Sequence, residues 1–230
     1  MCGRFTNQYS WRQLKELYDI TTPYLTSNFP PRYNIAPTQM SFVVRLDKEG
    51  KRELVEMKWG LIPSWAKDTT GGARMINAKA ETVAEKPAYR SAFLRRRCLV
   101  VADGFYEWKK ISPKEKQPYF ITSTDGKPFA FAGLYEWWKP NDGSALVESF
   151  TIITTTPNEL CAPIHDRMPG MLAPENWAVW LGATGDHKAL LKPFPVKDMQ
   201  CWPVTKDVGS VKNTGPELVL PIGLSAVAKS

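Results

Sequence analysis

The second residue of the chain is a cysteine, and its position allows chemistry that an internal cysteine cannot perform. Removal of an initiator methionine is favoured when a small residue follows, and it would leave Cys2 with a free α-amine beside its thiol. The ordinary pKa values of these groups are about 8 and about 8.5, so both have a reactive fraction near neutral pH. The amine condenses with an aldehyde to an imine, and the thiol then closes a thiazolidine ring. Cys2 is therefore a candidate nucleophile toward aldehydes.

Three further polar residues have types that suit proton transfer or positioning. His165 lies in a turn-like stretch between two prolines, whereas His187 is expected on a surface helix, so His165 is the better acid–base candidate. Glu107 follows an apolar strand among aromatic residues, where desolvation would raise its pKa and make it a general acid. It fits an outward-facing strand position equally well. Asn77 is neutral and could hold a substrate hydroxyl or the α-amine by hydrogen bonds.

The cysteines do not have the spacing of a metal or redox site. They stand at positions 2, 98, 161 and 201, with no CxxC pair and two histidines as possible further ligands. We therefore expect no metal, no cofactor and reduced thiols. Cys98, in an apolar run, is expected to pack in the core.

The charge balance suits a polyanionic partner. Lys and Arg number 30 against 23 acidic residues, giving a formal net charge of +7, which fits nucleic acid binding or ordinary solubility. Nine tryptophans favour the first interpretation, because exposed aromatic rings stack on bases. No apolar run approaches the ~20 residues of a membrane span. The N-terminus lacks the apolar region of a signal peptide, so we expect a cytoplasmic protein, nucleoid-associated when bound to DNA.

Short strands and few helices must position these residues. Ser10 and Gln13 match a capping box that starts a helix, Pro174 opens a helix to residue 180, and Asp186 is expected to cap another to residue 191. Residues 29–37 and 60–75 are predicted loops, and 206–222 is turn-rich. Strands are predicted at 41–46, 53–59, 98–102, 119–123, 129–137 and 150–155. This pattern predicts one α+β domain over residues 1–230, with a strongly bent, barrel-like, mostly antiparallel sheet flanked by short helices.

Seven short motifs, which include the four candidate residues, are spread over nearly the whole chain. They are Cys2-Gly3-Arg4-Phe5, Tyr33-Asn34-Ile35-Ala36-Pro37, Trp59-Gly60-Leu61-Ile62-Pro63-Ser64-Trp65, Asn77-Ala78-Lys79-Ala80-Glu81-Thr82, Ala102-Asp103-Gly104-Phe105-Tyr106-Glu107-Trp108, Ile164-His165-Asp166-Arg167-Met168-Pro169 and Val211-Lys212-Asn213. In this set the chain resembles the SRAP family, named for SOS response-associated peptidase. The name also suggests a role in the response to DNA damage.

The resemblance implies a function and a set of site residues. Members bind abasic sites in single-stranded DNA and form a thiazolidine crosslink through the mature N-terminal cysteine, here Cys2. By that likeness Asn77 positions the Cys2 amine and the sugar, Glu107 takes part in ring opening and proton transfer, and His165 moves protons. Abasic-site lyase and N-terminal self-processing activities are further expectations. The partner is single-stranded DNA, with no membrane, and the protein is expected to be a monomer.

The resemblance also implies a DNA-contacting set. It comprises Arg4, Pro37, Trp65, Lys79, Trp108, Thr154 and Arg167. Two positions depart from relatives, which often carry Arg at Lys79 and sometimes a second Trp at Ala66. Lysine keeps the charge but loses bidentate phosphate geometry, and one aromatic fewer weakens stacking.

Two other functions remain open at this point. An N-terminal cysteine with its own amine as base could be a cysteine peptidase or N-terminal-nucleophile hydrolase, although the sequence shows no clear oxyanion hole. The chain could also be a non-catalytic single-stranded DNA-binding module, which would bind in a salt-sensitive way without depending on Cys2.

Overall fold

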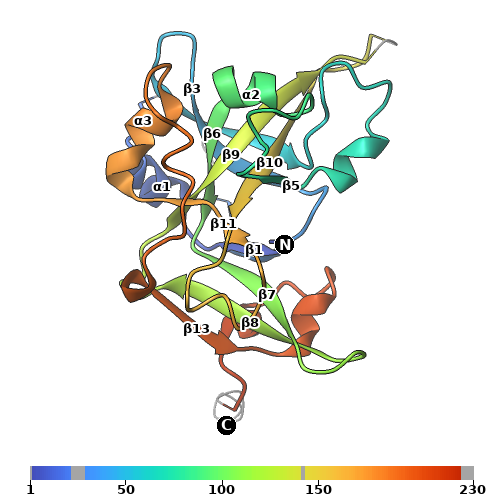
Figure 1. Ribbon diagram of the computed structural model, residues 1–230, viewed down its shortest axis with the longest axis vertical. Coiled ribbons are helices and arrows are strands. Elements are labelled where there is room, and N and C mark those ends of the chain that lie inside the picture. Colours follow the sequence, from blue (N-terminus) through green and yellow to red (C-terminus); the bar gives the residue numbers. More distant parts are fainter. Residues whose placement is uncertain (1, 22–28, 141–142, 224–230) are drawn as a thin grey trace.

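Five long strands close into a barrel in the computed structural model, which describes residues 2–21, 29–140 and 143–223 (Figure 1). Around the barrel they follow the order β10 (Val147–Thr155), β4 (Arg52–Trp59), β3 (Met40–Leu46), β6 (Arg97–Ala102) and β9 (Phe129–Trp138), and β9 pairs back onto β10. β10 and β4 pair in parallel, and the other neighbours are antiparallel. The predicted α+β class with a barrel-like, mostly antiparallel sheet is confirmed.

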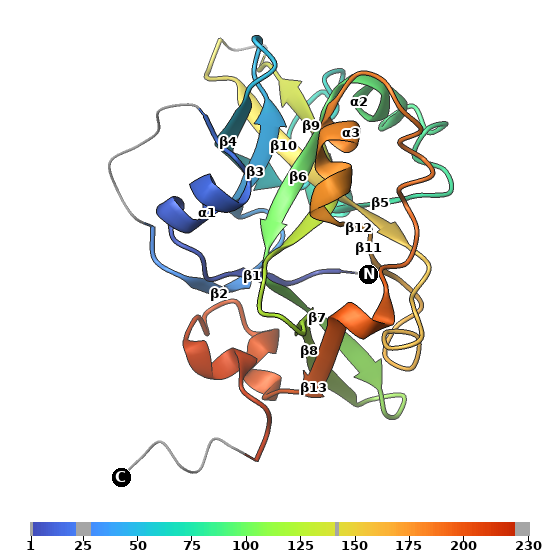
Figure 2. The same ribbon diagram turned by 90° about the vertical axis from the view of Figure 1, so that its left-hand side faces the viewer.

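A second sheet of five strands lies against one end of the barrel. Its order is β13 (Met199–Pro203), β8 (Lys116–Ser123), β7 (Gly104–Lys110), β1 (Phe5–Asn7) and β2 (Arg32–Ile35). β6 of the barrel continues through Asp103 into β7, so one chain segment joins the two sheets. Figures 1 and 2 show β1 of this second sheet, and the start of the chain that leads into it, where the sheet meets the barrel. The start of the chain is therefore held where the two sheets meet.

Three short strands extend the barrel sheet. β5 (Asn77–Lys79) pairs in parallel with β10, β11 (Met168–Pro169) pairs with β10, and β12 (Met171–Leu172) pairs with β9. β5 and β11 both contact the C-terminal half of β10. Residues 77–79 and 168–169 therefore meet at one end of β10.

Alternate residues of the barrel strands face two different cores, because successive strand residues point to opposite faces. Val43 and Val100 belong to a cluster with Phe131 and Phe150, and this cluster also contains Cys2. Their neighbours Val44 and Leu99 belong to the other cluster, which packs beneath the helices. Cys2 is therefore part of a hydrophobic core, and so is Cys98, as predicted.

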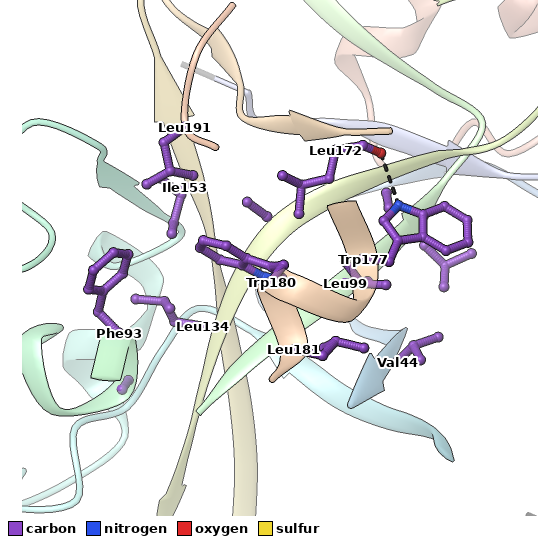
Figure 3. Close-up of a cluster of buried hydrophobic side chains, with 14 of the residues drawn as sticks. Val44, Phe93, Leu99, Leu134, Ile153, Leu172, Trp177, Trp180, Leu181 and Leu191 are labelled. Carbon is purple, nitrogen blue, oxygen red and sulfur yellow. Dashed lines mark hydrogen bonds between the residues drawn. The ribbon is translucent and has the colours of Figure 1, made fainter. Parts of the chain in front are cut away.

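The cluster beneath the helices is built around tryptophans of α3 (Trp177–Leu181), as Figure 3 shows. Trp180 is fully buried, and the Trp177 indole donates to the Leu172 carbonyl at 3.0 Å. The buried Arg97 guanidinium donates to backbone carbonyls at the ends of α2 (Arg90–Arg95) and α3. A cation at helix C-termini satisfies carbonyls that lack helical partners, so Arg97 joins both helices to the barrel.

The helix predictions are confirmed only in part. Ser10 forms the predicted capping box with Gln13 at the start of α1 (Trp11–Leu17). The segment from Pro174 begins as a 3₁₀ turn, η2 (Pro174–Asn176), before α3. The helix predicted from Asp186 is wrong: that carboxylate accepts from the Ala189 amide, but only turns follow. His187 is accordingly half-buried against aromatic rings rather than on a surface helix.

Several predicted loops contain regular structure. The proline-rich segment 29–37 contains β2, and residues 60–75 contain the 3₁₀ helix η1 (Thr70–Arg74). The remaining 3₁₀ helices are η3 (Val196–Asp198), η4 (Lys206–Gly209) and η5 (Pro216–Val219). Asn34 of β2 donates to the carbonyls of Val208, Ser210 and Asn213, which attaches the η4 segment to the second sheet. None of the helices in the described parts of the chain is long and apolar enough to cross a membrane.

Candidate active site

Cys2 is fully buried at the junction of the two sheets. It precedes β1, and the following Arg4 carbonyl accepts from the Tyr106 amide of β7 at 3.0 Å. The Cys2 Sγ lies 4.0 Å from the Arg4 carbonyl oxygen. Burial raises the pKa of the Cys2 thiol well above its ordinary value, and the nearby Glu107 carboxylate raises it further. The thiol is therefore protonated at neutral pH in this state.

Asn77 contacts Cys2 directly. Its Nδ2 donates to the Cys2 carbonyl at 2.8 Å across 75 residues of sequence. The pairing of Asn77 with Ile152 on β10 fixes the asparagine backbone, and the Tyr89 hydroxyl donates to its carbonyl. Its Oδ1 is buried, and no donor in the described part of the chain reaches it. Asn77 thus orients the Cys2 backbone and keeps one acceptor available to a ligand.

Glu107 is a buried acid beside the cysteine. It lies on β7, opposite Tyr119 of β8, with 3% of its surface exposed. Burial raises the pKa of Glu107 to about 7, with a smaller contribution from the negative charge of Asp166. A carboxyl group with this pKa can donate a proton near neutral pH. The structure therefore excludes the alternative in which Glu107 is an outward-facing strand residue.

His165 lies in the turn that leads into β11. Its amide donates to the Cys161 carbonyl at 2.9 Å, and its Nδ1 accepts from the Arg167 amide at 3.0 Å. Asp166 Oδ1 is also 2.9 Å from Nδ1, a contact that becomes an ion pair only when the ring is protonated. Burial lowers the pKa of His165, so the ring is neutral at neutral pH and can accept a proton.

The His165 turn, Glu107 and Cys2 are linked electrostatically. The Glu107 charge acts on the thiols of both Cys2 and Cys161, and Asp166 acts on Glu107. The structure therefore brings the four predicted catalytic residues into one region, from the N-terminal segment, β5, β7 and the turn before β11.

The predicted DNA-contacting residues differ in how available they are. Trp65 is 69% exposed on its loop, and Lys79 is exposed at the end of β5. Pro37 and Trp108 are half-buried. The side chains of the other three predicted contacts make bonds within the protein: Arg4 to the Gly209 carbonyl, Thr154 to the Ala78 carbonyl, and Arg167 to Glu81.

Sequence reasoning missed two contributors to the region. Asp166 contributes charge next to Glu107, and Glu81 forms a bidentate ion pair with Arg167. Both lie inside motifs shared with the family. The position of Asp166 next to the candidate His165 was a signal that could have identified it. Among the described residues, no group of three His, Cys, Asp or Glu side chains is arranged to hold a metal ion.

Comparison with known proteins gives concordant matches over the chain. A model of the family described as SOS response associated peptidase (SRAP) matches residues 1–211. The chain is 43% identical over 223 residues to the abasic site processing protein YoqW of Bacillus subtilis, covering 95% of this chain and 99% of that protein. It is 31% identical over 231 residues to the abasic site processing protein YedK of Escherichia coli, with 96% and 100% covered. The crystal structure of a Bacteroides thetaiotaomicron protein matches with a TM-score of 0.86 and 27% identity, covering 96% of this chain and 99% of that one.

Proposed function

Because the chain belongs to the SOS response associated peptidase (SRAP) family, we propose that it processes abasic sites in single-stranded DNA by bonding covalently to the lesion through Cys2. The names of the relatives support the substrate. The observation that carries the chemistry is the placement of Cys2, whose carbonyl accepts a hydrogen bond from Asn77 and whose thiol lies within the electrostatic influence of the buried Glu107.

The reaction proceeds in three steps once Met1 is removed. The Cys2 amine attacks C1′ of the ring-opened abasic sugar and gives a carbinolamine. Protonation of its hydroxyl allows water to leave, and an imine forms. The thiol then adds to C1′ while its proton passes to the nitrogen, closing a thiazolidine. One water is lost overall, and no oxidant or reductant is consumed.

The residues around Cys2 match the needs of these steps. Glu107, with its pKa of about 7, donates the proton that lets water leave. Neutral His165 accepts the proton released as the amine attacks. Asn77 holds the Cys2 carbonyl, and its Oδ1 accepts from the Cys2 amine or a sugar hydroxyl. The imine can also eliminate the 3′ phosphate, which would give an associated lyase activity.

The N-terminus provides the first test. Protein that begins at Cys2 is mixed with an oligonucleotide carrying one abasic site and is compared with protein that keeps an uncleaved N-terminal extension. We expect a heat-stable crosslink, with the mass of both components minus one water, only when Cys2 has its free amine. Denaturing gels and intact mass measure it.

The same experiment separates the rival functions. A crosslink in the extended protein would contradict the role of the amine. No crosslink in either protein would contradict the proposal and favour a peptidase. Cleavage of peptides that depends on Cys2 would then test the peptidase function. Equal binding of intact and abasic DNA with no bond formed would favour a non-catalytic binding module.

The exposed Trp65 ring is proposed to stack on a base beside the lesion. Stacking of one base on an aromatic ring contributes about 1–3 kcal/mol, so we expect Trp65→Ala to weaken single-stranded DNA binding by about 5- to 150-fold. Fluorescence anisotropy measures the change, and Trp65→Phe should keep much of the affinity. Trp137 is 39% exposed and lies outside the predicted DNA-contacting set, so Trp137→Ala is the control. Unchanged affinity in Trp65→Ala would contradict the stacking role.

A further inference from the structure

Glu81 and Arg167 form a two-point ion pair at the edge of the candidate site. Arg167 Nη1 lies 2.6 Å from Glu81 Oε1, and Nη2 lies 2.9 Å from Oε2. The Arg167 side chain is 11% exposed and that of Glu81 is 49% exposed, so the pair is partly shielded from solvent. Parallel N–H···O bonds of this kind are among the strong, geometrically specific contacts of arginine.

The backbone holds the same arginine from a second direction. Arg167 Nη2 also donates to the Thr154 carbonyl at 2.5 Å. Thr154 pairs with Lys79 of β5 and with Pro169 of β11, so this carbonyl belongs to the rigid end of β10. Arg167 is therefore fixed by a carboxylate after β5 and by a carbonyl on β10.

A count of donors shows what remains available for DNA. A guanidinium has five N–H groups, and Arg167 uses three of them on Glu81 and Thr154. The remaining two are one hydrogen on Nη1 and the N–H of Nε, which is buried and has no partner in the described part of the chain. These two do not share an edge of the guanidinium. Arg167 cannot form two hydrogen bonds to one phosphate unless its bonds to Glu81 or to the Thr154 carbonyl are broken.

Glu81 remains charged in this arrangement. The hydrogen bonds from Arg167 lower the pKa of Glu81, and the positive charge of Lys79 contributes in the same direction. The carboxylate therefore competes with any phosphate for the guanidinium over the physiological pH range.

We propose that Glu81 determines selectivity: it occupies the bidentate edge of Arg167 and so prevents this arginine from binding backbone phosphates of undamaged single-stranded DNA. The inference rests on the proposed function, because it concerns the DNA that must be rejected before a lesion is found. Without Glu81, Arg167 becomes an additional phosphate-binding cation, and intact DNA occupies the site more strongly.

Salt dependence measures this effect directly. Each phosphate contact on a single strand adds about 0.7 to the slope of log affinity against log salt. We expect Glu81→Gln to steepen the slope for an intact oligonucleotide by about 0.7, an affinity gain of about 2.6-fold between about 200 and about 50 mM salt. Anisotropy titrations at several salt concentrations give the slope. Excess intact DNA should also inhibit crosslinking of abasic DNA more strongly in this variant.

Two further variants make the result decisive. Glu85 is an exposed acid four residues along the same turn region, and Glu85→Gln should leave the wild-type slope unchanged. The double variant with Glu81→Gln and Arg167→Gln should lose the added slope, because the released cation is gone. An unchanged slope in Glu81→Gln, or a steeper slope that persists in the double variant, would overturn the inference. Failure of the proposed function would instead appear as wild-type protein that forms no crosslink.

Discussion

Mature protein carrying Cys2→Ala is expected to form no heat-stable crosslink to abasic DNA, yet to be trapped on that DNA when borohydride is added. Alanine keeps the N-terminal α-amine, so the imine still forms at C1′. It lacks the thiol that closes the ring, so the imine reverts by hydrolysis or eliminates the 3′ phosphate. Denaturing gels with and without reductant, with scoring of strand cleavage, measure all three products.

A second buried cysteine provides the control. Cys161 lies in the same hydrophobic cluster as Cys2, and burial raises the pKa of both thiols, with a smaller contribution from the Glu107 charge. Cys161→Ala should crosslink like the wild type, because Cys161 is an internal residue whose thiol has no free α-amine on the same residue. A heat-stable bond in Cys2→Ala without reductant would show that the thiol does not close the ring.

The order of the steps follows from the burial of the Cys2 thiol. Burial and Glu107 keep this thiol protonated, so it is a weak nucleophile before DNA binds. In the proposed reaction the amine must therefore attack first, and the thiol acts once an imine carbon lies next to it. This order also explains why a buried cysteine can remain in the core without reacting nonspecifically with other electrophiles.

The four predicted catalytic residues lie in one region, but the sequence did not indicate the contacts that bring them there. The motifs grouped Cys2 with Asn77, Glu107 and His165, and the structure places them in one region. The contact between Asn77 and Cys2 depends on the parallel pairing of β5 with β10, and a three-residue strand has no periodic signature. The selectivity role proposed for Glu81 was equally hidden, because its partner lies 86 residues away.

The wrong element predictions have local physical causes. β2 was assigned to a loop because prolines surround it, but β2 is an edge strand of its sheet, where prolines are tolerated. The helix expected from Asp186 fails because Pro193 follows Leu191 closely and stops helical propagation. α2 was missed because its first residue has no side-chain cap to mark it.

Glu107→Gln is expected to slow crosslinking by about 10²- to 10⁴-fold, the usual contribution of a positioned general acid. The pH profile should change as well. In the wild type, ionisation of Glu107 removes the acid above pH 7 and the α-amine loses reactivity below about pH 8, which gives a bell-shaped rate. In Glu107→Gln the decline at high pH disappears, and the residual rate rises to a plateau. A retained decline at high pH would assign the acid to another group.

The same substitution should stabilise the fold, and this separates loss of chemistry from loss of structure. The pKa of Glu107 is raised to about 7 in the folded protein from about 4.5 when unfolded, so the folded state binds the proton more tightly. Stability therefore falls as pH rises from about 4.5 to about 7, by at most about 3 kcal/mol. Glutamine avoids this cost, so urea denaturation should find Glu107→Gln more stable than the wild type at pH 8 and nearly equal near pH 5.

Another buried acid gives the opposite expectation and serves as the control. Glu136 is 5% exposed but pairs with Arg96 at 2.8 Å, so Glu136→Gln leaves a cation without its partner and should lose stability at pH 8. Changes of opposite sign in the free energy of unfolding for the two substitutions would show that Glu107 lowers folding stability, as expected for an acid that serves the reaction. Equal losses would mean that the Glu107 carboxylate stabilises the fold, and its assignment as the general acid would then fail.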